Sequence, residues 1–416
     1  MRISTEQIFR SGTESMQRAQ SELNQTGMQL STGKRILTAS DDPAGATQSA
    51  QFREIIQSIE QFQRNTDLAQ PRLQQEEWAI AGVSDQLQRV RELMIQGAND
   101  SQTNETRGFM AREIREIRDS IFDVSNTKDP NGEYLFAGTE SLATPFEIDG
   151  NNVISYVGAD GEGSVREVAI TPIRKVAIGD NGADVFMNIT ENDGRVSADV
   201  NRAAATPRGS LVIEKTEVSN LDDFLTGTNA TDEFEISFQT DPVTGNLQYQ
   251  VENKTAGGFP IAWTDYSSGS PVEFAGRTLV LSGDPNVSDT VTSRPANNVS
   301  LFQTLDAIAT AFETPVGGSS SRADLTNAVN RGIADIDASF NHLSEVRATV
   351  GTRLQVIDDQ TELNEGRKLD LRSTLSELED LDYAEAISRF KFQQVALEAA
   401  QQSYVQVNRL SLFNFI

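Results

Sequence analysis

Two apolar repeats with a period of seven residues, one at each end of the chain, most constrain how this sequence can fold. The N-terminal ladder is Phe9, Met16, Leu23, Leu30 and Leu37, and the C-terminal ladder is Tyr383, Phe390, Leu397 and Tyr404. Apolar residues at this spacing form a narrow stripe along one side of a helix, and another helix has to cover that stripe. The sequence therefore predicts a chain whose two ends pack together, assemble with other copies, or do both.

The N-terminal ladder has a second regularity, because the residue three places after an apolar position is small. These small residues are Gly12, Ala19, Thr26 and Gly33. After the ladder, Asp42 is a favourable N-cap and Pro43 suits the first position of a new helix. If residues 43–98 are all helical, that helix is roughly 85 Å long at ~1.5 Å per residue, which is too long for a compact globular domain.

The composition excludes several kinds of chemistry. The 416 residues include no cysteine and a single histidine, His342, which rules out thiolate sites and any site that needs two histidines. A net charge of −26 argues against nucleic acid and anionic membranes as partners, because both bind clustered Lys and Arg. The adjacent carboxylates Asp41 and Asp42 are interpreted as helix-capping groups. We therefore expect no catalytic residue, no metal and no cofactor.

The pattern changes after Thr127, where short alternating runs replace the helical spacing. Phe234, Ile236 and Phe238 form one such run, and residues 241–246 separate it from the next. Alternation of this kind predicts β-strands, and the polar segment between the two runs predicts a hairpin connection. This region is also acidic, since residues 141–300 hold 23 acidic and 10 basic side chains. We predict a β-rich domain inserted between two sets of helices.

Helical spacing returns near Val299, and the last helix is expected to begin near Leu378 and to carry the C-terminal ladder. The predicted fold class is α+β, an elongated helical coiled coil and bundle built from both termini with an inserted β-rich domain. We divide the chain into terminal coiled-coil helices that are disordered in the monomer (1–40 and 378–416), a long-helix bundle (41–142 and 299–377) and the β-rich insert (143–298).

Several motifs in the helical flanks resemble the flagellin superfamily. They are residues 30–36 (LSTGKRI), 40–45 (SDDPAG) and 347–354 (RATVGTRL). Three further segments resemble the junction-protein branch of that family more than filament flagellin. These are residues 131–138 (NGEYLFAG), 380–387 (DLDYAEAI) and 410–413 (LSLF). The resemblance covers about half to two-thirds of the chain.

The resemblance implies a structural component of the bacterial flagellum, secreted by type III export and placed at the hook–filament junction. The partners that it implies are hook-associated protein 1, flagellin, other copies of this chain in a ring-like layer, and a flagellar export chaperone, with no nucleic acid and no membrane. The expected assembly interface joins the two ladders to further apolar residues near the C-terminus. Its members are Phe9, Met16, Leu23, Leu30, Leu37, Tyr383, Ile387, Phe390, Leu397, Tyr404, Leu410 and Phe413, with Asp42 and Pro43 as the helix cap.

Two alternatives stay open at this point. The chain could be a filament flagellin, although residues 131–138 and the Phe-rich end argue against it. The insert could instead be a carbohydrate-binding module in which Trp263 and Tyr266 stack on a sugar, although packing in a protein core is the more common role of such residues.

Overall fold

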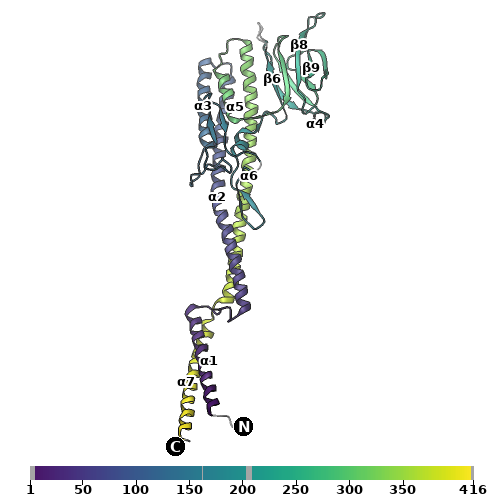
Figure 1. The fold of residues 1–416 in the computed structure, drawn as a ribbon. Coiled ribbons are helices and arrows are strands. Elements are labelled where there is room, and N and C mark those ends of the chain that lie inside the picture. The colour runs from purple at the N-terminus through teal and green to yellow at the C-terminus, as the bar shows by residue number, and fades with distance from the viewer. Residues whose placement is uncertain (1–4, 162, 203–208, 414–416) are drawn as a thin grey trace. The chain divides into compact units, whose positions relative to one another are not determined.

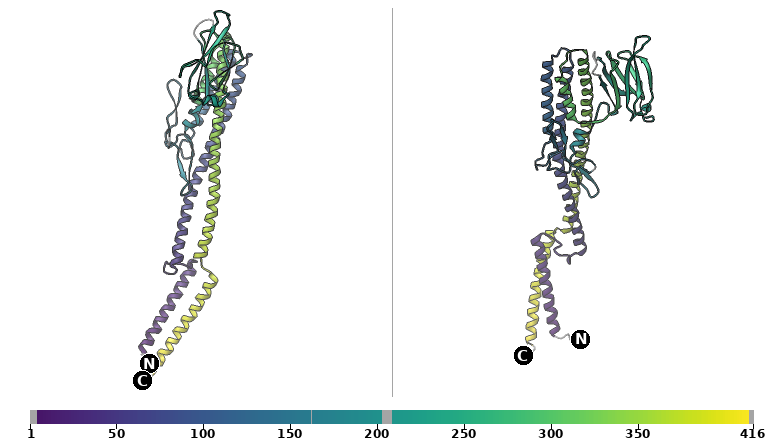
Figure 2. Two further views of the ribbon diagram at one scale, coloured as in Figure 1. Left: turned by 90° about the vertical axis from the view of Figure 1, so that its right-hand side faces the viewer. Right: turned by 45° about the horizontal axis from the view of Figure 1, so that its top comes forward.

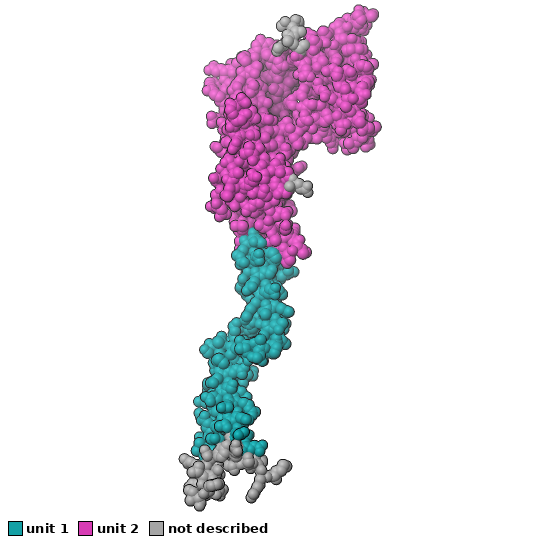
Figure 3. Space-filling view, viewed as in Figure 1, with its two compact units in different colours: residues 1–65, 358–416 teal, residues 66–357 magenta. Residues whose placement is uncertain are grey.

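The computed structural model describes residues 5–161, 163–202 and 209–413, and within these the side chains of residues 5, 6, 8, 9 and 407–413 lie outside the described part. The chain forms two compact units, which Figure 3 colours separately. Unit 1 consists of residues 1–65 and 358–416, and unit 2 consists of residues 66–357. Each unit is described by itself below.

Long helices flank a β-rich centre in the order of the chain. The helices are α1 (Thr5–Thr32), α2 (Pro43–Ala98), α3 (Asn104–Ser125), the π-helix η1 (Ala183–Met187), α4 (Leu221–Phe224), α5 (Leu301–Glu313), α6 (Ser319–Glu379) and α7 (Tyr383–Phe413). The first part of the predicted insert (143–298) holds the short strands β1 (Phe146–Ile148), β2 (Ile154–Tyr156), β3 (Glu167–Ala169), β4 (Lys175–Ala177) and β5 (Ile189–Thr190). From here on, the insert means the part from β6 to β13, residues 196–295. The predicted α+β class is confirmed, and residues 43–98 form one helix, α2, with Pro71 inside it.

One predicted helix start is wrong. Leu378 lies in the last turn of α6, and the last helix begins at Tyr383 instead. The break between the two helices has a local cause. Asp382 accepts the backbone N–H groups of Ala384 (2.9 Å) and Glu385 (3.2 Å), which caps a new helix at this point.

The helical part of unit 2 is a bundle of α2, α3, α5 and α6, which lie side by side in Figures 1 and 2. Its core is apolar, with Ile80, Leu87, Ile114 and Ile336 all buried. Four aromatic rings cluster in this core: Phe136 and Phe146 from the segment after α3, Phe186 of η1 and Phe302 of α5. Three of their contacts are edge-to-face, and the contact between Phe186 and Phe302 is tilted. Along α2, the residues Ile80, Val83, Leu87, Val90 and Met94 recur at helical spacing and are buried in this core, whereas Ile55 near the start of the helix is 46% exposed.

The insert is a sandwich of two antiparallel sheets. The larger sheet has the order β10-β9-β8-β13-β6, and the smaller has the order β11-β12-β7. The strands are β6 (Val196–Asn201), β7 (Val212–Val218), β8 (Phe234–Thr240), β9 (Leu247–Asn253), β10 (Ile261–Asp265), β11 (Pro271–Phe274), β12 (Arg277–Ser282) and β13 (Thr290–Pro295), followed by β14 (Asn298–Val299), which pairs with β5. Residues 241–246 connect β8 to β9 in register, so the predicted hairpin is confirmed.

A buried arginine crosses the interior of this sandwich. Arg277 donates to the backbone oxygens of Asn229 (2.7 Å) and Asp232 (2.8 Å) and to both oxygens of Ser293. Its guanidinium also lies 4.7 Å from the centre of the Phe234 ring. Burial lowers the pKa of Arg277 to about 10, because it disfavours the charged guanidinium. The nearby negative charge of Asp232 opposes this shift but does not cancel it.

Candidate assembly surface

The two ends of the chain pack against each other in unit 1. Helices α1 and α7 run side by side in both views of Figure 2. Glycines of α1 lie opposite aromatic side chains of α7. A methyl group added at Gly12 would lie 3.1 Å from the Tyr404 ring, and one added at Gly27 would lie 3.5 Å from the Phe390 ring. The missing side chains therefore allow the two helices to approach closely at these positions.

At the C-terminal end of α1, a glycine again lies opposite an aromatic side chain of α7. Gly33 has a φ of +72°, and a methyl group there would lie 2.8 Å from the Tyr383 hydroxyl oxygen. Gly12 and Gly33 are three heptads apart, and so are their partners Tyr404 and Tyr383, in the opposite order. The two helices are therefore antiparallel and keep one register over this length. Two of the small positions noted in the sequence, Gly12 and Gly33, receive aromatic residues of the C-terminal ladder.

This pairing covers the ladders only in part. Side chains of the expected interface that are half-buried are Met16, Leu23, Leu30, Leu37, Phe390, Leu397 and Tyr404. Tyr383 is 53% exposed and Ile387 is 44% exposed. The side chains of Phe9, Leu410 and Phe413 lie outside the described part of the structure. Among the described members of the interface, none is fully buried by the α1–α7 pair.

A second apolar face of α7 was missed by the sequence reasoning. Phe392 is 76% exposed and Val395 is 65% exposed. At ~100° per residue, Phe392 lies about 200° around the helix from the ladder residue Phe390. Since α1 covers the ladder side, these two residues lie on the other side of α7. The sequence signal for this face was the presence of two apolar residues outside the heptad positions, Phe392 and Val395. We overlooked it because the heptad ladder is so regular.

A short backbone clasp ties the end of α1 to the junction of α6 and α7. Leu381 donates its N–H to the carbonyl of Gly33 (3.0 Å), and Arg35 donates its N–H to the carbonyl of Glu379 (2.7 Å). The Glu379 carboxylate is 6% exposed and accepts from Lys34 (3.0 Å) and Arg53 (2.6 Å). Burial alone would raise the pKa of Glu379, but these hydrogen bonds outweigh it and the pKa is lowered.

The two adjacent carboxylates after the N-terminal ladder both bind backbone amides. Asp42 accepts the N–H of Gly45 at 2.9 Å, with Pro43 at the first position of α2. Asp41 accepts the N–H groups of Leu37 (3.1 Å) and Thr38 (2.9 Å). These backbone hydrogen bonds lower the pKa of both carboxyl groups. Asp41 and Asp42 thus stabilise the turn of the chain between α1 and α2.

Two family models match the helical flanks that carry this geometry. "Bacterial flagellin N-terminal helical region" matches residues 3–141, and "Bacterial flagellin C-terminal helical region" matches residues 333–416. Together they cover more than half of the chain. The chain belongs to the flagellin superfamily.

Within the flagellin superfamily, the chain is similar over its whole length to flagellar hook-associated protein 3 of Escherichia coli (strain K12). The two are 24% identical over 417 residues, which cover 99% of each chain. The crystal structure of flagellar hook-associated protein 3 from Legionella pneumophila is 28% identical with a TM-score of 0.72, and the match covers 79% of this chain and 98% of that chain. Flagellin of Bacillus subtilis (strain 168) is 30% identical, but over only 41% of this chain and 53% of its own.

The chain is a flagellar structural protein and not an enzyme, because its relatives are structural proteins of the flagellum. In the described residues, no group of three or more His, Cys, Asp or Glu side chains is arranged to hold a metal ion. No helix within the described ranges combines the length and apolar character that crossing a membrane requires.

Proposed function

We propose that this chain is the junction adaptor between hook-associated protein 1 and the flagellin filament. It would leave the cell by type III export, with the help of an export chaperone, and join other copies in a ring-like layer at the hook–filament junction. The observation that carries this proposal is the pair α1–α7, which leaves apolar side chains exposed on two sides of α7. We also propose that residues 1–40 and 378–416 are disordered in the monomer and become ordered on assembly, around the long-helix bundle and the insert.

The exposed apolar residues supply the driving force for assembly. Full burial of a large apolar side chain such as Phe392 or Val395 contributes roughly 1.5–3 kcal/mol before the entropy of ordering is subtracted. A helix with apolar residues on opposite sides needs a neighbour on each side. One neighbour is α1 of the same chain, and the other is proposed to be a terminal helix of an adjacent subunit, as a symmetric layer requires.

The kind of subunit that this chain would contact is suggested by its N-terminal and C-terminal helical regions. Flagellin-type helical regions at both ends of this chain supply helices that can pack against the corresponding helices of flagellin. The length of the matches favours a junction role over a filament flagellin, since the match to hook-associated protein 3 spans 99% of the chain and the match to the Bacillus subtilis flagellin spans 41%.

No observation favours the carbohydrate-binding alternative. The Tyr266 hydroxyl donates to the carbonyl of Gly283 (3.0 Å), and its ring packs edge-to-face on Phe238. Tyr266 therefore belongs to the packed interior of the insert, and Trp263 alone is left as an aromatic surface, 38% exposed.

The test is a charge placed within the C-terminal ladder. Leu397→Asp is expected to leave a soluble, folded unit 2 and to abolish incorporation at the junction, because a buried unpaired carboxylate is costly. Ala396→Asp adds the same charge at an exposed position of α7 that lies well away from the ladder, and it should assemble normally. Phe392→Asp tests the second face and should also abolish incorporation. The assays are motility of cells that carry each variant and electron microscopy of the isolated hook–filament junction.

Two results would overturn the proposal. Normal filaments with Leu397→Asp and Phe392→Asp would mean that neither face of α7 takes part in assembly. Long filaments formed by the purified wild-type chain alone would identify it as a filament protein instead of an adaptor.

A further inference from the structure

We propose that the β insert is a hinged arm that α6 holds closed through a polar latch centred on Arg331. A second arginine, Arg202 just after β6, also links the insert to α6 by pairing with Asp324 (2.7 Å). The arm is connected to the helical bundle by only two crossings of the chain, residues 191–195 and 296–297. A groove separates the insert from the helices beside these crossings. All of these parts lie within unit 2.

The two crossings have the features of a hinge. They follow the two-stranded ribbon β5–β14, in which Thr190 lies opposite Asn298. Two residues of the first crossing have left-handed backbone conformations, Asn192 (φ +54°) and Gly194 (φ +80°). A methyl group added at Gly194 would meet nothing within 4 Å, so this residue has free space around it. The neighbouring Asn192 donates its backbone N–H to Asp335 of α6 (3.0 Å), which adds a polar link between the hinge and the helix. Besides the ribbon, two backbone hydrogen bonds join the crossings, from Glu191 to Asn297 and from Ala296 to Arg195 (3.0 Å each).

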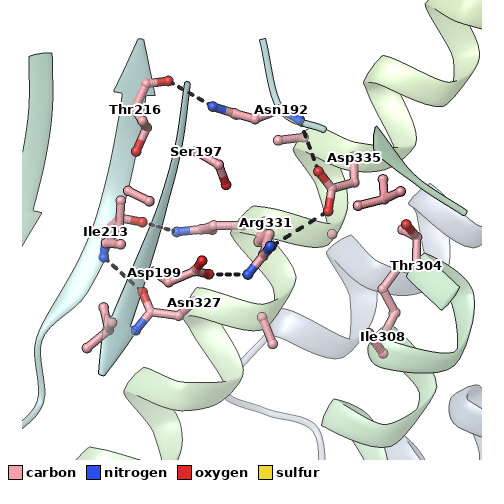
Figure 4. Close-up of a pocket in the computed structure, with 18 of the residues that line it drawn as sticks. Asn192, Ser197, Asp199, Ile213, Thr216, Thr304, Ile308, Asn327, Arg331 and Asp335 are labelled. Carbon is pink, nitrogen blue, oxygen red and sulfur yellow. Dashed lines mark hydrogen bonds and ion pairs between the residues drawn. The ribbon is translucent and has the colours of Figure 1, made fainter. Parts of the chain in front are cut away.

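Arg331 bridges the hinge and the arm. Its guanidinium pairs with Glu191 in the first crossing (2.8 Å), with Asp199 on β6 of the arm, and more distantly with Asp335 on its own helix (3.8 Å). The Glu191 side chain is fully buried, and it also pairs with Arg294 on β13. Figure 4 shows Arg331 reaching from α6 toward Asp199 on the strand. Three nitrogens of one planar guanidinium serve three carboxylates, a geometry that a lysine cannot reproduce.

A second contact set on the same face of α6 holds the exposed edge of β7. Asn327 accepts the N–H of Ile213 (2.8 Å) and donates to the carbonyl of Leu211 (3.0 Å), and Asn330 donates to the carbonyl of Ile213 (3.0 Å). These side-chain amides satisfy backbone groups that an edge strand would otherwise leave unpaired. They depend on α6 staying close, so they are lost when the arm moves away.

The groove provides the room for movement. It has a volume of about 720 Å³ and lies between β6 and β7 on one side and α5 and α6 on the other. Ser197 and Thr304 line it from opposite walls, as Figure 4 shows. An interface that is filled by a close-packed apolar core would fix the two parts, whereas a groove bridged by ion pairs and amides leaves polar links as the main restraint.

Distance measurements between two spin labels test the latch. Because the chain has no cysteine, Ser101→Cys and Val243→Cys place one label beside the helical bundle and one on the exposed β8–β9 hairpin. The otherwise wild-type protein should give one narrow distance distribution. Arg331→Ala should add a separate, longer population, and combining it with Asn327→Ala should enlarge that population. Arg372→Ala removes an exposed arginine of the same helix, which pairs with Glu60, and should leave the distribution unchanged.

Hydrogen exchange separates a moving arm from an unfolded one. In Arg331→Ala, the amide of Ile213 should lose protection, whereas the amides of β8 should keep theirs. If Arg331→Ala does not fold, Asp199→Asn removes a single acceptor of the latch and is measured instead. An unchanged distance distribution in the folded variant, a wild-type distribution already as broad as that of the variant, or loss of protection throughout β8 would each overturn the proposal.

Discussion

Glu76 carries the sharpest prediction, because a carboxyl group that is fully inaccessible to solvent stands in an otherwise apolar row of α2. Its Oε1 accepts the N–H of Asp180 (2.9 Å), and its Oε2 has no hydrogen-bond partner. Burial, together with the negative charge of Asp180, raises the pKa of Glu76 to about 8, although the Asp180 amide and the charges of Arg353 and Arg72 lower it. The folded protein therefore holds a proton on Glu76 at neutral pH.

The pH dependence of stability follows from the difference between the pKa of Glu76 in the folded chain and its pKa in the unfolded chain. The unfolded chain releases the proton near pH 4.5 and the folded chain near pH 8, so the folded state binds more protons between these values. The stability that Glu76 contributes is fully present below pH 4.5 and is lost as the pH rises to 8. At about 1.4 kcal/mol per pH unit, the free energy of unfolding falls by roughly 3 kcal/mol from pH 4.5 to pH 7 and by roughly 4 kcal/mol from pH 4.5 to pH 8.

Glu76→Gln replaces the protonated acid by a permanently neutral group of the same shape. Urea unfolding of the variant and the wild type, followed by circular dichroism, should give similar stabilities near pH 5 and a more stable variant at pH 8.5, by about 3 kcal/mol or more. The difference between the free energies of unfolding of the variant and the wild type cancels the contribution of all other titrating groups. Glu77→Gln, which removes a partner of Arg347 at the next position, should give a small difference that does not grow with pH. Equal losses of stability in wild type and Glu76→Gln between pH 5 and 8.5 would refute the reasoning.

Two further variants test the buried charges of the insert and the clasp. Arg277→Lys should destabilise the insert by about 3 kcal/mol, because an ammonium cannot satisfy the spread carbonyl groups that the guanidinium bridges. Urea unfolding followed by Trp263 fluorescence, in a Trp78→Phe background that removes the other tryptophan, measures this change. Arg195→Lys, at an exposed arginine, is the control, and equal midpoints for Arg277→Lys and the parent protein would contradict the prediction. In the assembled layer, where the clasp is proposed to be ordered, Glu379→Gln should speed hydrogen exchange at the amide of Leu381 several-fold at pH 7. It should have little effect below pH 4, since a lowered pKa contributes stability that is lost as the pH falls. A similar change in the exposed Glu377→Gln would exclude the proposed role of the ion pairs.

The sequence was sufficient wherever a local pattern determines the structure. Asp42 and Pro43 predicted the start of α2, because a capping carboxylate followed by proline is a local signal that begins a helix. The alternation around Phe234 predicted β8, and the turn residues 241–246 predicted its hairpin. The start of α7 could also have been found, since Asp382 followed three residues later by Glu385 is a capping pattern. The start that we expected, near Leu378, lies four residues before this cap.

Long-range partners could not be predicted in the same way. Glu76 looked like an interruption of an apolar row, and its environment depends on Asp180 and Arg353, which are far away in the sequence. The small residues beside the N-terminal ladder were visible, but the aromatic partner of each depends on the register between α1 and α7. Arg331 stood in a helical row with no sign that carboxylates from two other segments would meet it.

The pairing of α1 with α7 also sets an order of events during synthesis. About 350 residues separate the end of α1 from the start of α7, so the first helix made waits for the last. At ~5–20 residues per second, a ribosome needs on the order of tens of seconds to produce that length. Throughout this time the apolar stripe from Met16 to Leu30 has no partner from its own chain. Each newly made molecule therefore passes through a stage in which its N-terminal stripe can bind a holding protein or the wrong neighbour.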